Sequence, residues 1–266
     1  MRTYIVAILV LFFSVSCSEY QKVLKSNDPE VKYDKAVYYF EKNDFMRAST
    51  LFDEISKYYR GTERSEKVLV YLARSYMGQK DYFTAIEYYK TYVKTYPKGT
   101  YITEARYMIG YCYYKDSPDA RLDQTATHDA INALQEFIDV HPDSERVPEA
   151  NKLLDELKNK LVLKELLSAK LYYNLGSYLG NNYLSSIIVA QNALKNYPSN
   201  NYREELSYVI LQSKYQQALM SVEDKKTDRY RDTIDEYYNY TNEFPQGKYN
   251  KEASKIFNEA KKVVKE

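Results

Sequence analysis

A short turn sequence recurs along the chain and constrains its fold more than any other feature. In four copies an aromatic residue or histidine precedes a proline, a small or turn-forming residue follows two positions later, and a new helical pattern begins. The prolines are Pro97, Pro142, Pro198 and Pro245, and an earlier copy has Arg60 at the equivalent position. Proline cannot extend the preceding helix, so each copy ends one pair of helices and starts the next. Self-similarity of this kind predicts a solenoid.

The residues before each proline follow the tetratricopeptide pattern, which has a period of about 34 residues. A small residue stands where two paired helices must approach closely, and larger residues one and two turns later fill the space between them. These positions hold Ala48, Phe52 and Ile55; Ala85, Tyr89 and Tyr92; Ala130, Leu134 and Phe137; Ser186, Ala190 and Ala193; and Thr233, Tyr237 and Tyr240. The pattern predicts an all-α tetratricopeptide repeat solenoid of five helix pairs with a C-terminal capping helix from about residue 249 to 264.

Three repeats are longer than the first. The small residues of the paired helices are twelve positions apart in the first two repeats, twenty in the third (Gly110 to Ala130) and seventeen in the fourth (Ala169 to Ser186). We expect the extra residues of the third repeat in its inner turn, and we expect the charged segment 220–232 of the fifth to form an exposed loop. Such loops can bind partners, but a tolerated solvent-exposed insertion is the more common explanation.

Helix start signals divide the rest of the chain. Asp28 before Pro29 is typical of an N-cap followed by proline at the first helical position. A long helix is expected from Pro148 to about Leu175. The predicted divisions are 1–16 as a signal peptide, 17–27 as a lipidated N-terminus and tether, 28–144 as repeats 1–3, and 145–266 as repeats 4–5 with the capping helix.

The N-terminus has the parts of a secretory signal: Arg2, a short apolar run, and small residues at a cut site. The apolar run, residues 4–13, is shorter than the ~20 residues that a spanning helix needs. The position of Cys17 resembles the lipobox of bacterial lipoproteins, in which cleavage leaves the cysteine free for diacylation. The alternative is an ordinary secretory signal with a chance cysteine. In many bacteria an aspartate directly after the lipidated cysteine resembles a signal for retention in the inner membrane. Here Ser18 follows Cys17, which favours the periplasmic face of the outer membrane.

The composition gives little support to other functions. The formal net charge is +1, and removing residues 1–16 brings it to about zero, which argues against nucleic acid as a partner. His128 and His141 lack the spacing of a metal site, so we predict no metal. Cys112 is expected to be a small buried hydrophobic residue. No phosphate-binding glycine loop or nucleophile motif is present, and we predict no enzymatic activity and no cofactor beyond a covalent lipid on Cys17.

Taken together, these features resemble the BamD family, the tetratricopeptide-repeat lipoproteins of the β-barrel assembly machinery. The resemblance runs from about Ser26 to Lys255, and its more specific parts are SNDPEVKYDKAVYYFEKNDF, DYFTAIEYYKTYVKTYPKGTY and KNKLVLKELLSAKLYYNLGSY. It implies a scaffold anchored by lipid to the periplasmic side of the outer membrane. Its last repeats would bind the periplasmic domains of a BamA-like barrel-inserting protein, and its first repeats would receive unfolded outer membrane protein clients.

The resemblance also implies a peptide groove lined by the first helix of each early repeat. We expect Arg74 or Lys67 to meet the C-terminal carboxylate of a client peptide while Tyr107 and Tyr111 pack its aromatic side chain. The alternative is that these residues only cover the concave face. The predicted groove residues are Tyr33, Val37, Phe40, Lys67, Val70, Arg74, Met77, Tyr107, Tyr111 and Tyr114.

A second implied contact lies in the fifth repeat. An arginine that opens the first helix of this repeat in the family resembles a salt-bridge partner of the barrel-inserting protein, and Arg203 has the equivalent place here. The alternative function is that of a periplasmic repeat lipoprotein that organises cell-wall or division enzymes. It predicts association with peptidoglycan factors.

Overall fold

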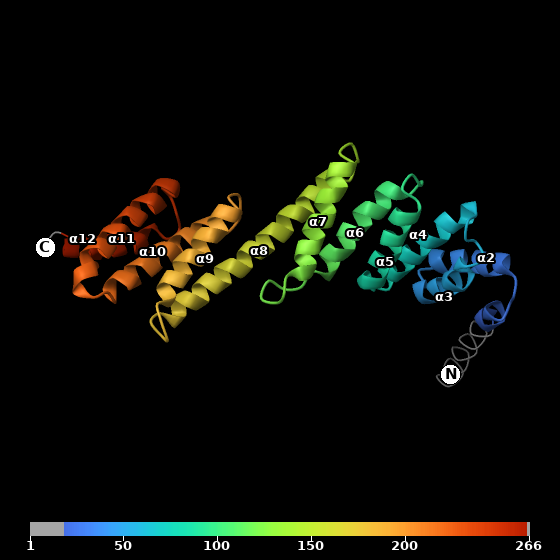
Figure 1. The fold of residues 1–266 in the computed structure, drawn as a ribbon, viewed down its shortest axis with the longest axis horizontal. Helices are drawn as coiled ribbons and strands as arrows, with labels where there is room; N and C mark the ends of the chain where they lie inside the picture. The colour runs from blue at the N-terminus through green and yellow to red at the C-terminus, as the bar shows by residue number, and fades with distance from the viewer. Residues whose placement is uncertain (1–18, 265–266) are drawn as a thin grey trace, which may run out of the picture. The chain divides into compact units, whose positions relative to one another are not determined.

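The computed structural model describes residues 19–264, and every regular element in this range is an α-helix (Figure 1). This confirms the predicted all-α class. Contacts divide these residues into two compact units: residues 19–117 with 125–152, and residues 118–124 with 153–264. The helices are α2 (Pro29–Glu41), α3 (Phe45–Ser56), α4 (Glu63–Gly78), α5 (Tyr82–Thr95), α6 (Ile102–Asp116), α7 (Thr125–Val140), α8 (Val147–Leu175), α9 (Asn182–Asn196), α10 (Arg203–Leu219), α11 (Glu223–Glu243) and α12 (Asn250–Val264).

In the first unit, successive helices from α2 to α7 pack against one another. The small residues of the repeat pattern lie at these contacts, and both Ala48 and Ala85 are fully buried. Gly110 shows the close approach directly, since a Cβ at this position would lie only 2.7 Å from the side chain of Leu134. The repeat spacing therefore identified the residues that set the distance between paired helices.

The inner turns of the first two repeats use the same local device. Asn43 and Lys80 adopt left-handed backbone conformations, with φ of 58° and 63°, and an aspartate follows each of them. The carboxylate of Asp44 accepts a hydrogen bond from the Arg47 amide at 3.3 Å, and Asp81 caps α5 in the same way. An N-cap of this kind satisfies an amide that the helix leaves unpaired. Each turn therefore ends one helix and starts the next within a few residues.

Buried tyrosines join successive repeats through their hydroxyl groups. The hydroxyl of Tyr92 donates to Glu66 and accepts a hydrogen bond from the amide of Tyr101 at 2.8 Å. A Cβ on Gly99 would collide with the same hydroxyl. The small residue after the repeat proline therefore makes room for a tyrosine that caps the next helix, and Tyr240 does the same beside Gly247.

The segment before α2 is folded rather than a simple tether. Residues 19–24, within the predicted tether 17–27, are helical. The ring of Tyr20 meets the ring of Tyr39 edge-on at 5.7 Å, and Val23 is buried in the core of the first repeat. Residues three and four positions apart lie on one helix face, so the Tyr20, Val23 and Leu24 side chains can all pack against this repeat.

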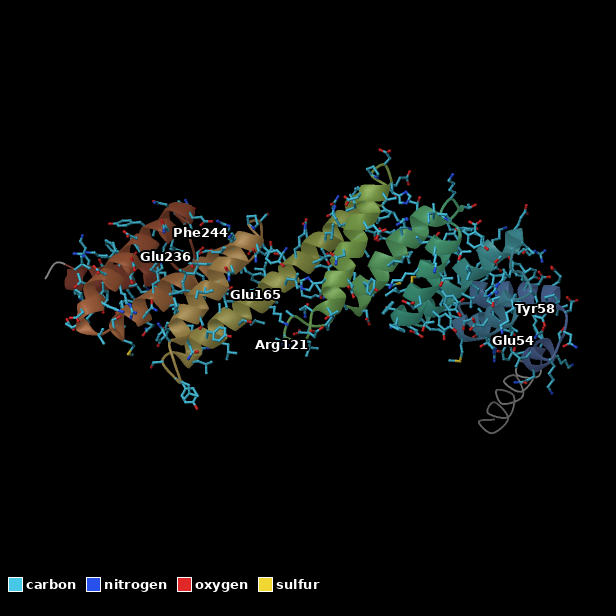
Figure 2. All side chains as sticks on the ribbon, viewed as in Figure 1. Glu54, Tyr58, Arg121, Glu165, Glu236 and Phe244 are labelled. Atoms are coloured by element: carbon cyan, nitrogen blue, oxygen red, sulfur yellow. The ribbon has the colours of Figure 1, made fainter. Side chains whose placement is uncertain are left out.

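The second unit contains most of α8, followed by α9 to α12. Leu166 and Ala169 of α8 pack with Ile187 of α9 and Leu206 of α10. The last helix, α12, packs against both α10 and α11, which confirms the predicted capping helix. Ion pairs also join neighbouring helices. Lys214 of α10 pairs with Glu236 of α11, which is labelled in Figure 2.

One predicted insertion is a loop and the other is not. Residues 117–124 connect α6 to α7 without regular structure, as expected for the third repeat. The predicted loop 220–232 is wrong, because α11 begins at Glu223 and runs for 21 residues. This segment contains no glycine or proline, its first turn carries two acidic residues that favour a helix N-terminus, and Tyr230 is buried.

Candidate functional site

The predicted groove residues on the first helices remain partly accessible in most cases. Lys67 is exposed and forms no ion pair within residues 19–264. The half-buried members are Tyr33, Val37, Phe40, Arg74, Met77, Tyr111 and Tyr114. A ligand on this face would therefore contact aromatic and aliphatic side chains together with two cations, Lys67 and Arg74.

Val70 and Tyr107 do not line a surface, so their predicted place in the groove is wrong. Each is only 1% exposed. Val70 belongs to the core between α4, α5 and α6, while the ring of Tyr107 lies 5.4 Å from that of Phe137, under the guanidinium of Arg146. Burial also raises the pKa of the Tyr107 hydroxyl. These positions fill the space between repeats, and the register of the repeat alone assigned them to a surface by mistake.

Arg74 is held by a carboxylate of its own chain. Its Nε donates to Glu104 at 2.8 Å and its terminal nitrogen donates to the second oxygen at 2.5 Å. Burial alone would lower the pKa of Arg74, but the hydrogen bond and the charge of Glu104 outweigh it, and the pKa is raised. The cation also lies 5.4 Å from the ring of Tyr101. A client carboxylate at this position would have to replace Glu104.

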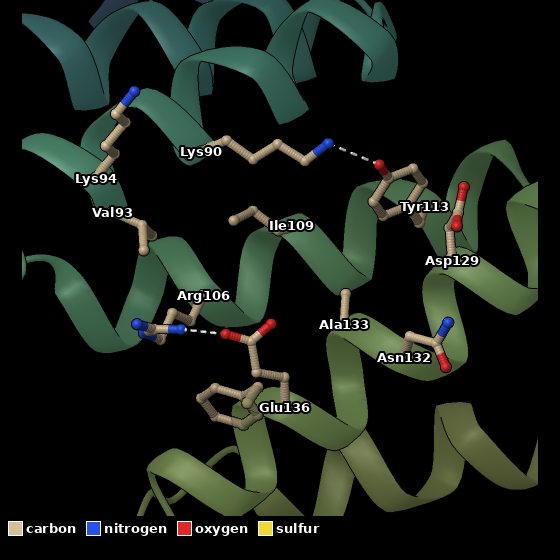
Figure 3. A pocket seen from close by; sticks show the side chains of 11 residues that line it. Lys90, Val93, Lys94, Arg106, Ile109, Tyr113, Asp129, Asn132, Ala133 and Glu136 are labelled. Carbon is tan, nitrogen blue, oxygen red and sulfur yellow. Dashed lines mark hydrogen bonds and ion pairs between the residues drawn. The ribbon is translucent and has the colours of Figure 1, made fainter.

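A surface pocket of about 340 Å³ lies elsewhere in the first unit, between α5, α6 and α7 (Figure 3). Its apolar lining comes from Val93, Ile109, Ala133 and Phe137. None of the ten predicted groove residues lines it. The second helix of repeat 2 and both helices of repeat 3 supply the lining, so the pocket opens on a different face from the one that the repeat register selects.

Charged groups of both signs surround this pocket. Arg106 pairs with Glu136 at 2.5 Å, and Lys90 donates to the Tyr113 hydroxyl at 2.9 Å, a hydrogen bond that raises the pKa of Lys90 (Figure 3). Lys94 forms no ion pair among the described residues. The pocket can therefore take an apolar side chain together with a neighbouring acidic group. The signal that could have revealed it is a pair of apolar residues, Val93 and Ile109, at positions outside the repeat core.

Arg203 begins α10 and is also engaged within the chain. It pairs with Glu243 at the end of α11 and donates to the backbone oxygen of Pro198 at 3.0 Å. Both side chains of the pair are about one-third exposed. The predicted role of Arg203 at a partner interface stays a prediction.

Cys17, the predicted lipidation site, lies outside the described residues. Within residues 19–264, no group of three or more His, Cys, Asp or Glu side chains could hold a metal ion. Over the same range, no helix is long and apolar enough to cross a membrane. Cys112 is buried, and burial raises the pKa of its thiol to about 12.

Comparison with known proteins adds evidence independent of this geometry. The outer membrane protein assembly factor BamD of Caulobacter vibrioides is 23% identical over 179 residues, which cover 66% of this chain and 59% of the relative. The putative outer membrane protein assembly factor BamD of Aquifex aeolicus is 26% identical over 208 residues, which cover 77% of this chain and 66% of the relative. The chain thus spans less than two thirds of the length of each relative.

Solved structures and a family model complete the comparison. The tetratricopeptide repeat domain of P58(IPK) is 15% identical with a TM-score of 0.41, and the match covers 94% of this chain and 67% of that domain. The model of the family YfiO, described as outer membrane lipoprotein, matches residues 25–180. This match covers more than half of the 266 residues. The chain therefore belongs to the YfiO family of outer membrane lipoproteins.

Proposed function

We propose that this chain is a non-enzymatic scaffold in the assembly of outer membrane proteins. The observation that carries the proposal is the family match over residues 25–180, together with two relatives that are named as assembly factors. The fold is compatible with this role, because stacked helix pairs present extended surfaces on which other proteins bind.

The partner in this proposal is a BamA-like barrel-inserting protein. Its periplasmic domains would bind the last repeats, α10 to α12, where Arg203 is the predicted contact. A lipid on Cys17 would hold the chain on the periplasmic side of the outer membrane. Truncating one partner of a buried interfacial charge pair costs about 2–5 kcal/mol. Arg203→Glu is therefore expected to weaken the complex if the partner displaces Glu243 from this arginine.

Unfolded clients would bind the first repeats through a C-terminal segment that ends in an aromatic residue and a carboxylate. Two surfaces offer both an apolar contact and a cation: the first-helix face beside Arg74, and the pocket beside Lys94. We assign the peptide to the first-helix face because Lys67, Arg74 and Tyr111 lie there together on adjacent repeats. Arg74→Glu should then weaken binding of such a peptide. Lys94→Glu, the matched charge reversal at the pocket, should leave the affinity unchanged; the opposite result would move the client site to the pocket.

Affinity purification from cell envelopes tests the function as a whole. The tagged full chain would be extracted in mild detergent, and the proteins bound to it identified by mass spectrometry. Recovery of a barrel protein with periplasmic repeat domains, in near equal amount, is the expected result. Recovery of cell-wall or division enzymes without this barrel protein would refute the assembly role and favour the alternative function of organising those enzymes.

A further inference from the structure

The turn between α8 and α9 lies within the longest uncharged stretch of the folded chain. Residues 171–194 contain no Asp, Glu, Lys, Arg or His, although 28% of the whole chain is charged. At that frequency about seven charged residues would be expected in 24 positions. The fourth repeat is also longer than the first by five residues at this point. The extra residues therefore enlarge a turn whose surface carries no charge.

Large apolar side chains are exposed at this turn and on both helices that it joins. Tyr178 and Leu179 at its tip are 68% and 90% exposed. The loop extends past the ends of both helices that it joins (Figure 1). The other members of this apolar collar lie on the last turns of α8 and the first turns of α9. The apolar collar comprises Leu171, Leu175, Tyr178, Leu179, Leu184 and Ile188.

The backbone holds the tip in a defined conformation. Leu179 has a φ of 53°, a left-handed conformation that is unfavourable for leucine. Gly176 and Gly180 on either side also have positive φ, and the amide of Asn182 donates to the backbone oxygen of Gly176 at 3.0 Å. The side chain of Asn181 then caps α9 by accepting from the Leu184 amide at 3.2 Å. The turn thus presents an apolar tip at the expense of local backbone strain.

We propose that the apolar collar inserts into the interfacial region of a lipid bilayer. Its residues lie on both helices of the hairpin and at its tip, which suits a medium that surrounds the tip rather than a protein surface that would cover one side. The collar covers residues 171–175 at the end of α8 and residues 182–188 at the start of α9. At 1.5 Å per residue, these segments rise by about 6 and 9 Å. Apolar faces of interfacial segments are buried by about 5–10 Å in the headgroup and acyl boundary.

The charge pattern supports the same occupant. No charged group of the collar would lose its hydration on insertion, and tyrosine is a residue that favours the membrane interface. The first charged residue beyond the collar on α8 is Lys170, which pairs with Glu205. Membership of an outer membrane lipoprotein family gives the chain access to a bilayer. This contact is separate from a lipid on Cys17 and does not depend on the assembly role proposed above.

A tryptophan reporter tests the insertion directly, because the chain contains no tryptophan. The full chain with Tyr178→Trp would be reconstituted into vesicles of phosphatidylethanolamine and phosphatidylglycerol, with and without brominated acyl chains. Tyr58→Trp is the matched control, since Tyr58 is 67% exposed and belongs to the first unit (Figure 2). Both variants carry the same N-terminus, so any anchoring by that end is equal.

The expected result is a blue-shifted emission and strong quenching by brominated lipid for Trp at position 178, and neither for Trp at position 58. Adding Leu179→Asp should abolish both effects, whereas Phe83→Asp, at another exposed apolar position, should not. Asp tolerates the backbone conformation of residue 179, so circular dichroism should be unchanged. Equal spectra at positions 178 and 58 would overturn the proposal. A blue shift without quenching would also overturn it, because the tip would then be buried against protein.

Discussion

A chain of buried hydroxyl groups links three helices of the second unit and provides a sharp test of its packing. The hydroxyl of Ser213 on α10 donates to that of Ser186 on α9 at 2.9 Å, and Ser186 donates to the backbone oxygen of Ala169 on α8 at 2.8 Å. Both serines are fully buried. Ser186→Ala and Ser213→Ala should therefore lower the free energy of unfolding by different amounts, because the polar groups that they leave unpaired differ.

The magnitudes follow from those groups. Ser186→Ala leaves the buried Ser213 donor without its acceptor, and the free energy of unfolding should fall by about 1–3 kcal/mol. Ser213→Ala leaves the bond from Ser186 to Ala169 intact, and the expected loss is about 0.5–1.5 kcal/mol. In the double variant no unpaired hydroxyl remains, since both polar groups are replaced by apolar ones of similar shape. Its loss should be smaller than the sum of the single losses by about 1 kcal/mol or more.

Urea unfolding of the full chain, followed by far-ultraviolet circular dichroism, measures these three values. Ser49→Ala is the control, because Ser49 is also buried but belongs to the first unit and shares no partner with Ser186. Its effect should add to that of Ser186→Ala within experimental error. Strict additivity of Ser186→Ala and Ser213→Ala would refute the reasoning, because it would mean that the donor of Ser213 finds another partner.

Three further outcomes are expected. The Cys112 thiol should react with iodoacetamide at pH 8 far more slowly in the folded chain than in urea, because burial raises its pKa to about 12. Between pH 9 and 12 the folded state holds this proton more tightly than the unfolded state does. The free energy of unfolding should therefore fall as the pH rises through that window. Asp228→Pro should lower the free energy of unfolding by about 3 kcal/mol if 223–243 is helical, whereas a loop would tolerate it; thermal denaturation distinguishes the two. Gly99→Ala should cost about 1–3 kcal/mol in the same assay by displacing the Tyr92 hydroxyl from its two partners.

The sequence predicted the elements that depend on local spacing. The small residues at the helix contacts, such as Ala48 and Gly110, could be identified because close approach excludes any larger side chain at those positions. The start of α2 was also predicted, since Asp28 accepts from the Glu30 amide at 2.9 Å and Pro29 needs no amide there. Steric exclusion and capping act within a few residues, so one sequence suffices to read them.

Features that depend on tertiary contacts could not be predicted in the same way. The charges of 223–232 resemble those of a solvated loop, whereas the burial of Tyr230 against α10 and α12, which favours the helix, depends on residues distant in the sequence. The side chain of Tyr92 could be assigned to the core, but the hydrogen bond that its hydroxyl accepts from the amide of Tyr101, nine residues away, could not be predicted. For the candidate site, repeat register located a face but could not separate half-buried Tyr111 from buried Tyr107.

Of the cations assigned to partner carboxylates, Arg74 and Arg203 are already paired within the chain, and the strength of those ion pairs decides whether a partner could still use them. Arg74 and Glu104 are each 29% exposed, and Arg203 and Glu243 are each 37% exposed. Ion pairs at such accessible sites are typically worth about 0.2–1 kcal/mol, since water screens the charges. A ligand that also buries an aromatic ring gains about 1.5–3 kcal/mol from that burial. The free energy gained by burying one aromatic side chain of a ligand therefore exceeds that lost when Glu104 or Glu243 is displaced. The internal carboxylates would disfavour only ligands that bring a charge without an apolar contact.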